Sequence, residues 1–281
     1  MGYNGYRIIS DEKEIADFYQ GEYPVEDILE NEYVIISGAD GKEDFYCKHN
    51  NEIISVEYPF FYHDIEGKIK PRNPQQRCAM DLLLNPESKI KLLRGVYGSG
   101  KDYLMRYGAI NLIERGKFDK IIFVRPNITV AGLPDIGALP GTAEEKLEWC
   151  LGPFYDMTGG REETEKMLAE EKLEIVPLGF IRGRSFRNSI IYVTEGQNMT
   201  TEMVKLLIGR VGEGSELWIN GDCHKQVDRE IFKKDNGITT MLEAFKGHPL
   251  FGYVYLPTTE RSEVAKMCDI LDNFEIRGNQ S

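Results

Sequence analysis

The chain has 281 residues, of which 41% are hydrophobic, and it carries a formal net charge of −12 at pH 7. This length allows one large domain or two modest ones, and the acidic balance argues against a uniformly basic surface that would coat nucleic acid. No apolar run is long enough to cross a bilayer, and the first residues lack the pattern of a secretory signal. The five cysteines are scattered, which predicts reduced thiols. We therefore expect a cytoplasmic protein with no membrane contact.

Residues 1–68 differ from the rest of the chain because short β-branched and aromatic runs alternate there with turn residues. A short acidic helix is predicted near the start, over Asp11–Gln20. Strands are predicted at Tyr33–Ser37, Asp44–Cys47 and Ile53–Tyr58. The sequence thus predicts a small β-rich N-terminal module over residues 1–68 and a second domain over residues 69–281.

Short apolar runs alternate with helical patterns through the second domain. Asn73 suits a helix N-cap and Pro74 the first helical position, so a helix is expected over Gln76–Leu84. Further helices are predicted at Tyr103–Glu114, Ala143–Tyr155, Thr200–Arg210, Gly237–Phe245 and Glu260–Leu271. Strands are predicted at Ile90–Leu93, Lys120–Val124, Leu173–Leu178, Ser189–Val193, Glu216–Ile219 and Tyr253–Leu256. This alternation predicts an α/β fold whose mostly parallel sheet is covered on both faces and binds ligands at the carboxyl ends of its strands.

The strongest functional signal is a glycine-rich segment between the strand that starts at Ile90 and the helix that follows it. It reads Gly95-Val96-Tyr97-Gly98-Ser99-Gly100-Lys101-Asp102. Spaced glycines let backbone N–H groups face a phosphate at a helix N-terminus, and Lys101 supplies positive charge for the outer phosphates. An incidental glycine-rich turn is the alternative, which the flanking strand and helix disfavour. A phosphate loop usually has Ser or Thr after the lysine, whereas this chain has Asp102.

The strand Ile190–Val193 leads into a second candidate site, at Thr194 and Glu195. In hydrolysing P-loop proteins such a strand ends in Asp-Glu, where the Asp supports magnesium and the Glu polarises the attacking water. Here the hydroxyl and the carboxylate have exchanged positions, because Asp102 follows the lysine and Thr194 replaces the Asp. We expect Asp102 to ligate magnesium, Thr194 to hold one of its waters, and Glu195 to activate the attacking water. The alternative is a decayed site that no longer hydrolyses nucleotide.

Three further places hold side chains suited to phosphate. Arg182, Arg184 and Arg187 cluster before the Ser189 strand and are candidates for contact with nucleic acid, because an arginine fork fits phosphate. A solvated basic loop is the alternative for this cluster. Arg261 opens the last predicted helix, and Gln226 follows the Glu216 strand, where a glutamine can sense a γ-phosphate.

From about Lys70 to Leu271, these and other segments resemble the PhoH-like ATPases, which are relatives of the superfamily 1 helicases. The β-rich segment before Lys70 is similar to the linker ahead of the ATPase core in nuclease-fused members, and the chain before it is too short for the nuclease. The segments that carry the resemblance are Arg72-Asn73-Pro74-Gln75-Gln76, Arg125-Pro126, Asp135 to Thr142 with Glu145-Lys146, Ile181 to Ser185, Arg210 to Gly214, Phe245 to Phe251 and Glu260 to Glu263.

The resemblance implies a RecA-like core that binds ATP, often in a ring of six, with a role in RNA unwinding or RNA metabolism in bacteria and phages. It implies that Gln76 reads the adenine, that Gly95 to Lys101 hold the phosphates, that Glu195 activates water, that Gln226 senses the γ-phosphate and that Arg261 serves as an arginine finger. Three departures put hydrolysis in question more than binding: Asp102 stands for Thr, Thr194 stands for Asp, and the spacing from Gly-Asp to Gln226 is one residue longer.

The sequence therefore predicts a magnesium-dependent ATPase that acts on single-stranded RNA or DNA. A single RecA-like core has no second motor domain, so translocation requires a homo-oligomer, for which the resemblance suggests a hexamer. The main alternative is a nucleotide-bound scaffold without turnover, which steady-state phosphate release would distinguish. A small-molecule kinase is a weaker alternative, against which the Arg-Asn-x-x-Gln element argues.

Overall fold

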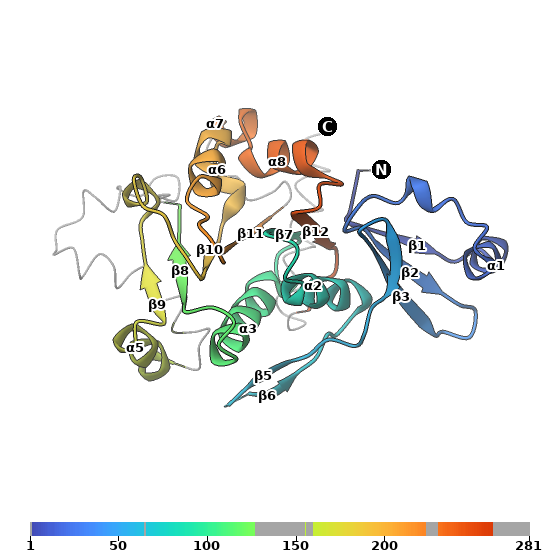
Figure 1. Ribbon diagram of the computed structural model, residues 1–281, viewed down its shortest axis with the longest axis horizontal. Helices are drawn as coiled ribbons and strands as arrows, with labels where there is room; N and C mark the ends of the chain where they lie inside the picture. The colour runs from blue at the N-terminus through green and yellow to red at the C-terminus, as the bar shows by residue number, and fades with distance from the viewer. Residues whose placement is uncertain (1, 65, 127–154, 156–159, 223–229, 261–281) are drawn as a thin grey trace, which may run out of the picture.

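The computed structural model describes residues 2–64, 66–126, 155, 160–222 and 230–260 (Figure 1). Three sheets are formed in this part of the chain. A four-stranded sheet has the order β1-β2-β3-β4, a six-stranded sheet has the order β12-β7-β11-β10-β8-β9, and β5 and β6 form a separate hairpin. The four-stranded sheet lies at one end of the molecule and the six-stranded sheet occupies the rest, with the hairpin below α3 in the view of Figure 1.

The N-terminal sheet confirms the predicted β-rich character of the first 68 residues. Its strands are β1 (Tyr6–Ile9), β2 (Tyr33–Ser37), β3 (Glu43–His49) and β4 (Glu52–Ser55), and α1 (Glu12–Gln20) connects the first two. The strand β1 pairs parallel to β2, whereas β2–β3 and β3–β4 are antiparallel. The four-residue strand β1 was not expected from the sequence. Four residues give little sequence signal for a strand, and β1 forms because its backbone pairs with β2.

The six-stranded sheet confirms the α/β class, because every neighbouring pair of strands is parallel. All five residues of β10 are buried, as expected for a strand that is covered on both faces. The predicted strand from Leu173 ends earlier, at Ile175, and a turn of 3-10 helix follows at Leu178–Phe180. The strands are β7 (Ile90–Gly95), β8 (Lys120–Val124), β9 (Leu173–Ile175), β10 (Ser189–Val193), β11 (Glu216–Gly221) and β12 (Phe251–Leu256).

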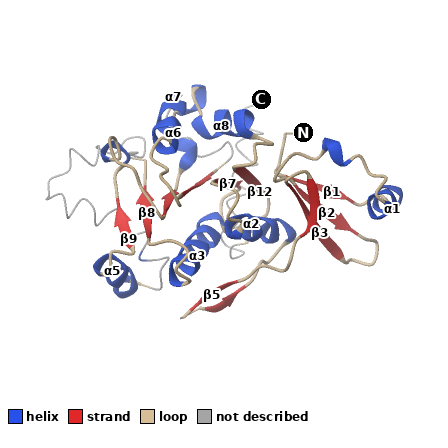
Figure 2. Ribbon diagram, viewed as in Figure 1, coloured by secondary structure: helices blue, strands red, loops and turns tan. Residues whose placement is uncertain are grey.

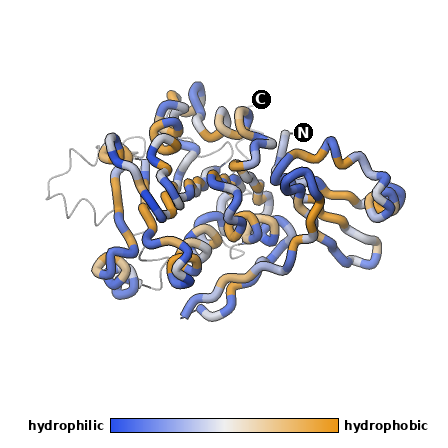
Figure 3. Tube along the Cα trace, viewed as in Figure 1, coloured by the Kyte–Doolittle hydropathy of each residue, from blue (hydrophilic) through white to orange (hydrophobic). Residues whose placement is uncertain are grey.

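Helices cover both faces of this sheet (Figure 2). Residues of α2 (Pro74–Leu84) and α3 (Lys101–Glu114) share one core cluster with Tyr192 of β10, and residues of α6 (Thr201–Ile208) and α8 (Gly237–Phe245) share another with the alternate side chains of the same strands. Apolar residues accordingly recur along the strands of this sheet (Figure 3), and those of the helices that are buried pack against it. The structure adds α5 (Arg161–Ala169) and α7 (Glu230–Lys234). The helices expected over Ala143–Tyr155 and Glu260–Leu271 lie almost wholly outside the described residues.

The hairpin of β5 (Phe61–His63) and β6 (Gly67–Ile69) packs on α3 and forms part of the site described below. Phe61 is fully buried, and a Cβ atom added to Gly108 of α3 would lie only 3.1 Å from its ring. Asn111 of α3 fixes the hairpin further, because its Nδ2 donates to the Tyr62 carbonyl at 3.0 Å. A glycine on α3 therefore lets the hairpin approach the helix closely.

The N-terminal sheet contacts the six-stranded sheet directly. Tyr33 belongs to the same core cluster as α2, and Asn31 Nδ2 donates to the carbonyls of Pro249 at 2.9 Å and Phe251 at 3.0 Å. Before β1, the Asn4 carbonyl accepts a hydrogen bond from Tyr255 N of β12 at 3.0 Å. A division at residue 68 would pass through this shared core, and it stays a prediction. Within the described ranges, no helix combines the length and apolarity needed to span a bilayer.

Candidate nucleotide site

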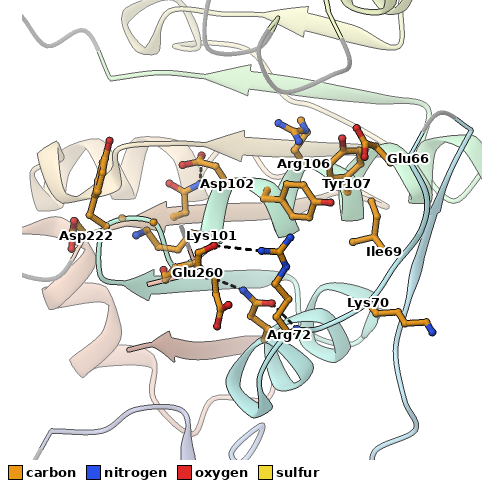
Figure 4. A pocket seen from close by; sticks show the side chains of 18 of the residues that line it. Glu66, Ile69, Lys70, Arg72, Lys101, Asp102, Arg106, Tyr107, Asp222 and Glu260 are labelled. Atoms are coloured by element: carbon orange, nitrogen blue, oxygen red, sulfur yellow. Dashed lines mark hydrogen bonds between the residues drawn. The ribbon is translucent and has the colours of Figure 1, made fainter. Parts of the chain in front are cut away.

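A cavity of about 820 Å³ opens at the carboxyl ends of β7, β10 and β11 (Figure 4). The glycine-rich loop and the first turns of α3 form its floor, and the ends of β10 and β11 form one wall. The β5–β6 hairpin and the segment that leads into α2 form the opposite wall. The position agrees with the rule that open parallel sheets bind ligands beyond the carboxyl ends of their strands.

The glycine-rich loop has the geometry of an anion site. It connects the end of β7, Gly95, to the first residue of α3, Lys101, and Gly98 and Gly100 adopt φ of 73° and 88°, a region that favours glycine. The Lys101 ammonium donates to the carbonyls of Gly95 at 2.9 Å and Val96 at 2.8 Å, so it lies over its own loop. The loop therefore places backbone N–H groups, a lysine and the N-terminus of a 14-residue helix around one point.

Asp102 lies in the first turn of α3, at the centre of a hydrogen-bond network. Its Oδ1 accepts from the Tyr192 hydroxyl at 2.7 Å, from Thr194 Oγ1 at 3.0 Å and from Asn220 Nδ2 at 2.7 Å. Its Oδ2 has no hydrogen-bond partner among the described residues, and Asp102 lines the cavity. Burial, followed by the charge of Asp102, raises the pKa of the Tyr192 phenol well above its usual value, which keeps the phenol a donor. The network thus fixes one carboxylate oxygen and leaves the other oxygen for a ligand.

Glu195 lies one residue beyond Thr194 and also lines the cavity. Its backbone is left-handed, with φ of 56°, which is uncommon for a residue other than glycine. Gln197 Nε2 donates to Glu195 Oε2 at 2.7 Å, and Gln197 Oε1 accepts from Asp222 N at 3.0 Å. Gln197 therefore orients the Glu195 carboxylate and ties it to the loop after β11.

Gln76 lies on the other side of the phosphate loop and lines the cavity, although only 4% of it is exposed. Its Nε2 donates to the Ser99 carbonyl at 3.1 Å, and its Oε1 accepts from Arg72 N at 2.9 Å. Glu260 is held beside it, because Asn73 Nδ2 donates to Glu260 Oε1 at 2.6 Å. The Gln76 amide thus connects the phosphate loop to the start of α2. The expected contact of Gln76 with adenine stays a prediction.

Of the other predicted site residues, only the three arginines before β10 belong to the described part of the chain. Gln226 and Arg261 lie outside the described residues. Arg182, Arg184 and Arg187 are absent from the cavity lining, and Arg184 Nη1 pairs with Glu174 Oε1 of β9 at 2.6 Å. The role of these three arginines in binding nucleic acid stays a prediction.

Sequence reasoning missed Tyr192 and Asn220, which hold Asp102. The signal was present in the strand pairing, because β10 and β11 run in parallel with Val193 opposite Ile219. The residues that come next in the chain, Thr194 just after β10 and Asn220 near the end of β11, are therefore neighbours, and Thr194 Oγ1 lies 3.3 Å from Asn220 Oδ1. Tyr192 shares a face with Thr194 because side chains alternate along a strand.

The carboxylate of Asp102 is a suitable ligand for magnesium. This ion prefers oxygen ligands and usually binds through one or two carboxylates and substrate phosphates while it keeps several waters. Asp102 offers Oδ2 beside the phosphate loop, and the described residues contain no cluster of three or more His, Cys, Asp or Glu side chains that would form a complete protein cage. The residues therefore fit a magnesium ion that a bound polyphosphate helps to hold. Thr194 contacts Asp102 and lies behind it, so its expected water contact stays a prediction.

The parallel sheet with a phosphate loop between β7 and α3 defines a P-loop NTPase-like core. The family model for PhoH-like proteins matches residues 68–271, and the chain belongs to this family. The chain is 36% identical to the protein PhoH2 of Bacillus subtilis over 208 residues, which cover 71% of this chain and 46% of that protein. It is 32% identical to PhoH2 of Thermobispora bispora over 203 residues, with the same shares covered. A PhoH-like protein of Bacillus subtilis is 32% identical over 184 residues, which cover 64% of this chain and 56% of the relative. The match thus spans about half the length of each relative.

Proposed function

We propose that this protein is a magnesium-dependent ATPase that acts on single-stranded RNA or DNA in the cytoplasm. The observation that carries the proposal is the contact between Asp102 and Thr194 beside the phosphate loop, where Thr194 Oγ1 donates to Asp102 Oδ1 at 3.0 Å. The carboxylate and the hydroxyl have exchanged positions in the sequence, yet the two groups still meet. One carboxylate and one hydroxyl therefore still lie together beside the phosphate loop, which supports a working metal site.

In this proposal the triphosphate lies along the loop from Gly95 to Lys101, and Lys101 leaves its own carbonyl partners to contact the outer phosphates. Asp102 and the phosphates would hold magnesium, which would supply positive charge against the charge on the transferred phosphoryl group. Glu195 accepts the proton of a water that attacks the γ-phosphate in line, while the bond to the ADP oxygen breaks. Gln197 keeps the Glu195 carboxylate in one orientation through its 2.7 Å hydrogen bond.

A double-mutant cycle tests the proposal. Asp102→Thr removes the carboxylate of the pair, and Thr194→Asp places two carboxylates in contact, so each single change is expected to lower phosphate release. The double exchange restores one carboxylate and one hydroxyl and is expected to recover much of the activity. Calorimetry with magnesium and a non-hydrolysable ATP analogue reports binding in the same variants.

A second Thr–Asp pair in this chain supplies the matched control. Thr201 Oγ1 donates to Asp235 Oδ1 at 2.6 Å, and neither residue lines the cavity. The reciprocal exchange of Thr201 and Asp235 is expected to leave phosphate release unchanged. A double exchange of Asp102 and Thr194 that is no better than the single variants would contradict the reciprocal site.

The three departures from the family pattern, at Asp102, at Thr194 and in the spacing to Gln226, favour a second candidate, a nucleotide-bound scaffold without turnover. Heat of binding with magnesium and the ATP analogue, combined with no phosphate release at any RNA concentration, would establish the scaffold. The ATPase proposal includes a homo-oligomer, for which we propose a hexamer. In it, Arg261 reaches the γ-phosphate in cis or from a neighbouring subunit, and Gln226 senses it.

A further inference from the structure

A second cavity, of about 790 Å³, is formed where the chain that leads into β5 lies beside the C-terminal ends of α2 and α3. No described residue lines both this cavity and the nucleotide cavity. Its walls combine exposed aromatic rings with carboxylates, and we call it the aromatic groove. The residues that line it include Tyr58, Phe60, Tyr62, Asp64, Asn111 and Glu114. The groove is therefore a candidate site separate from the phosphate loop.

Three aromatic rings line the groove from one segment of chain. Exposed and buried residues alternate along this segment, as in a strand with one side toward solvent. Tyr58, Phe60 and Tyr62 lie on the outward side and are 52%, 45% and 54% exposed. The segment is anchored, because Phe61 is fully buried and Asn111 Nδ2 donates to the Tyr62 carbonyl at 3.0 Å. Large aromatic side chains gathered on one anchored, exposed face indicate a binding surface.

Carboxylates outnumber cations in the groove. Among the described lining residues the carboxylates are Glu57, Asp64, Asp81 and Glu114, and the cations are Arg115 and Lys172. Lys172 Nζ is paired with Glu170 Oε2, outside the lining, at 2.7 Å. Burial, followed by the negative charges of Asp64 and Glu163, raises the pKa of Glu114. The groove therefore holds negative charge that the described part of the chain does not neutralise.

Uncharged groups add to this negative character at the α3 end of the groove. Asn111 lines the groove and is 5% exposed, and its Oδ1 has no hydrogen-bond partner among the described residues. The last residues of α2 and α3, Leu84 and Glu114, also line the groove, and neither helix has a basic residue in its last turn. The C-terminal end of a helix carries partial negative charge and favours a cation. A ligand that donates hydrogen bonds and carries positive charge therefore suits this end.

Two rings of the groove already hold cations of the chain itself. The Lys68 ammonium lies 3.8 Å from the ring centroid of Phe60, and the Arg77 guanidinium carbon lies 5.2 Å from that of Tyr58. Aromatic faces attract such groups through the ring quadrupole. Within the described ranges, no cation stacks on the ring of Tyr62. Tyr62 is therefore the ring left open for an external cation.

We propose that the aromatic groove binds an extended, lysine- or arginine-bearing segment of a partner protein, with one cation between the Tyr62 ring and the carboxylates of Asp64 and Glu114. A peptide suits the groove better than a small cation, because acidic residues lie at both ends of the segment, at Glu57 and Asp64, with the rings between them. An extended chain covers this separation of about 20 Å. The site goes beyond the proposed function, since the nucleotide cavity has its own described lining residues.

The test is fluorescence anisotropy of the full chain, without nucleotide, with a fluorescein-labelled peptide that alternates arginine and serine. A peptide that alternates glutamine and serine is the neutral probe and is expected not to bind. Asp64→Asn with Glu114→Gln is expected to weaken binding of the arginine peptide by about 2- to 30-fold, the effect of two exposed charge pairs. Glu12→Gln with Glu14→Gln is the matched control, because it removes the same charge from α1 and should leave the affinity within about twofold of wild type.

The ring is tested separately. Tyr62→Ala is expected to weaken binding of the arginine peptide by about 2- to 5-fold, whereas Tyr62→Phe keeps an aromatic face and should stay near wild type. Tyr62, Asp64 and Glu114 are exposed, so these variants are expected to fold as wild type does.

Three results would overturn the inference. The first is an arginine peptide that fails to bind wild type or binds no better than the glutamine peptide. The second is equal loss of affinity in the groove variant and the α1 control, which would indicate attraction to the net charge of −12 alone. The third is spermidine that binds with dependence on Asp64 and Glu114 while the arginine peptide does not, which would assign the groove to a small cation.

Discussion

Tyr192→Phe removes one hydroxyl from the network that holds Asp102 and changes little else. The hydroxyl donates to Asp102 Oδ1 at 2.7 Å and lies 3.2 Å from Asn220 Nδ2. The ring is 1% exposed and packs against Phe123 at a centroid distance of 5.5 Å, so phenylalanine fits the same space. The substitution therefore removes the two hydrogen bonds of this hydroxyl, one donated to Asp102 and one accepted from Asn220, and leaves the packing of the ring.

The expected cost follows from the geometry. A hydrogen bond to a charged acceptor contributes about 1.5–3 kcal/mol. Asp102 is only partly buried, and its Oδ1 keeps the donors Thr194 and Asn220, so the loss should lie near the lower end, about 1.5 kcal/mol. The less constrained carboxylate should also bind magnesium more weakly, by up to roughly tenfold if the whole loss is transmitted.

Two measurements check this reasoning. Urea unfolding gives the change in the free energy of unfolding, and a magnesium titration of ATP-analogue binding gives the change in metal affinity. Tyr33→Phe is the matched control, because the Tyr33 hydroxyl donates to Asp81 Oδ2 at 2.8 Å and Tyr33 is also 1% exposed. The control should lose similar stability without any change in the magnesium titration. Equal shifts of the magnesium midpoint in both variants, or an unchanged stability of Tyr192→Phe, would refute the reasoning.

Three further predictions concern buried charge, pH and catalysis. Lys91 Nζ lies 2.7 Å from Glu216 Oε2, and Lys91→Met breaks this buried ion pair. The single variant should lower the free energy of unfolding in urea by about 3–5 kcal/mol, because it leaves a buried carboxylate without a partner. The double variant Lys91→Met with Glu216→Gln should recover most of this loss. Burial lowers the pKa of Lys91 from 10.5 to about 8, so between these values the unfolded chain binds more protons than the folded one and stability rises with pH. Wild type should gain up to roughly 3 kcal/mol over Lys91→Met across this range, and a difference that stays flat with pH would contradict the assignment. Glu195→Gln should lower phosphate release by about 10²- to 10⁴-fold with nucleotide binding retained, as checked by calorimetry.

The large sheet was predictable because buried parallel strands are continuous apolar runs. Lys120–Val124 and Ser189–Val193 form strands with the predicted bounds. The β5–β6 hairpin was not predictable, because Phe61–His63 has only three residues and depends on the close approach to Gly108 of α3. Local propensity cannot report such a contact, which joins residues 47 positions apart in the chain.

The same distinction applies to the site. The phosphate loop is a contiguous motif, so its position between β7 and α3 followed from the sequence, whereas the direct hydrogen bond from Thr194 to Asp102 was not expected. Tyr192 and Asn220 reach Asp102 only because β10 and β11 are neighbours in one register. Roles in metal binding and hydrolysis remain predictions for these residues.

The contact of Asn4 with Tyr255 limits how copies of this protein can assemble. The strand β12 is an outer strand of the large sheet, and an exposed outer strand is a template for pairing with another chain. Here the protein's own first residues occupy it, and at Gly5 even a methyl group would overlap the Tyr253 carbonyl, at 1.8 Å. Continuation of the large sheet past β12 into another copy would therefore require residues 4 and 5 to leave this edge.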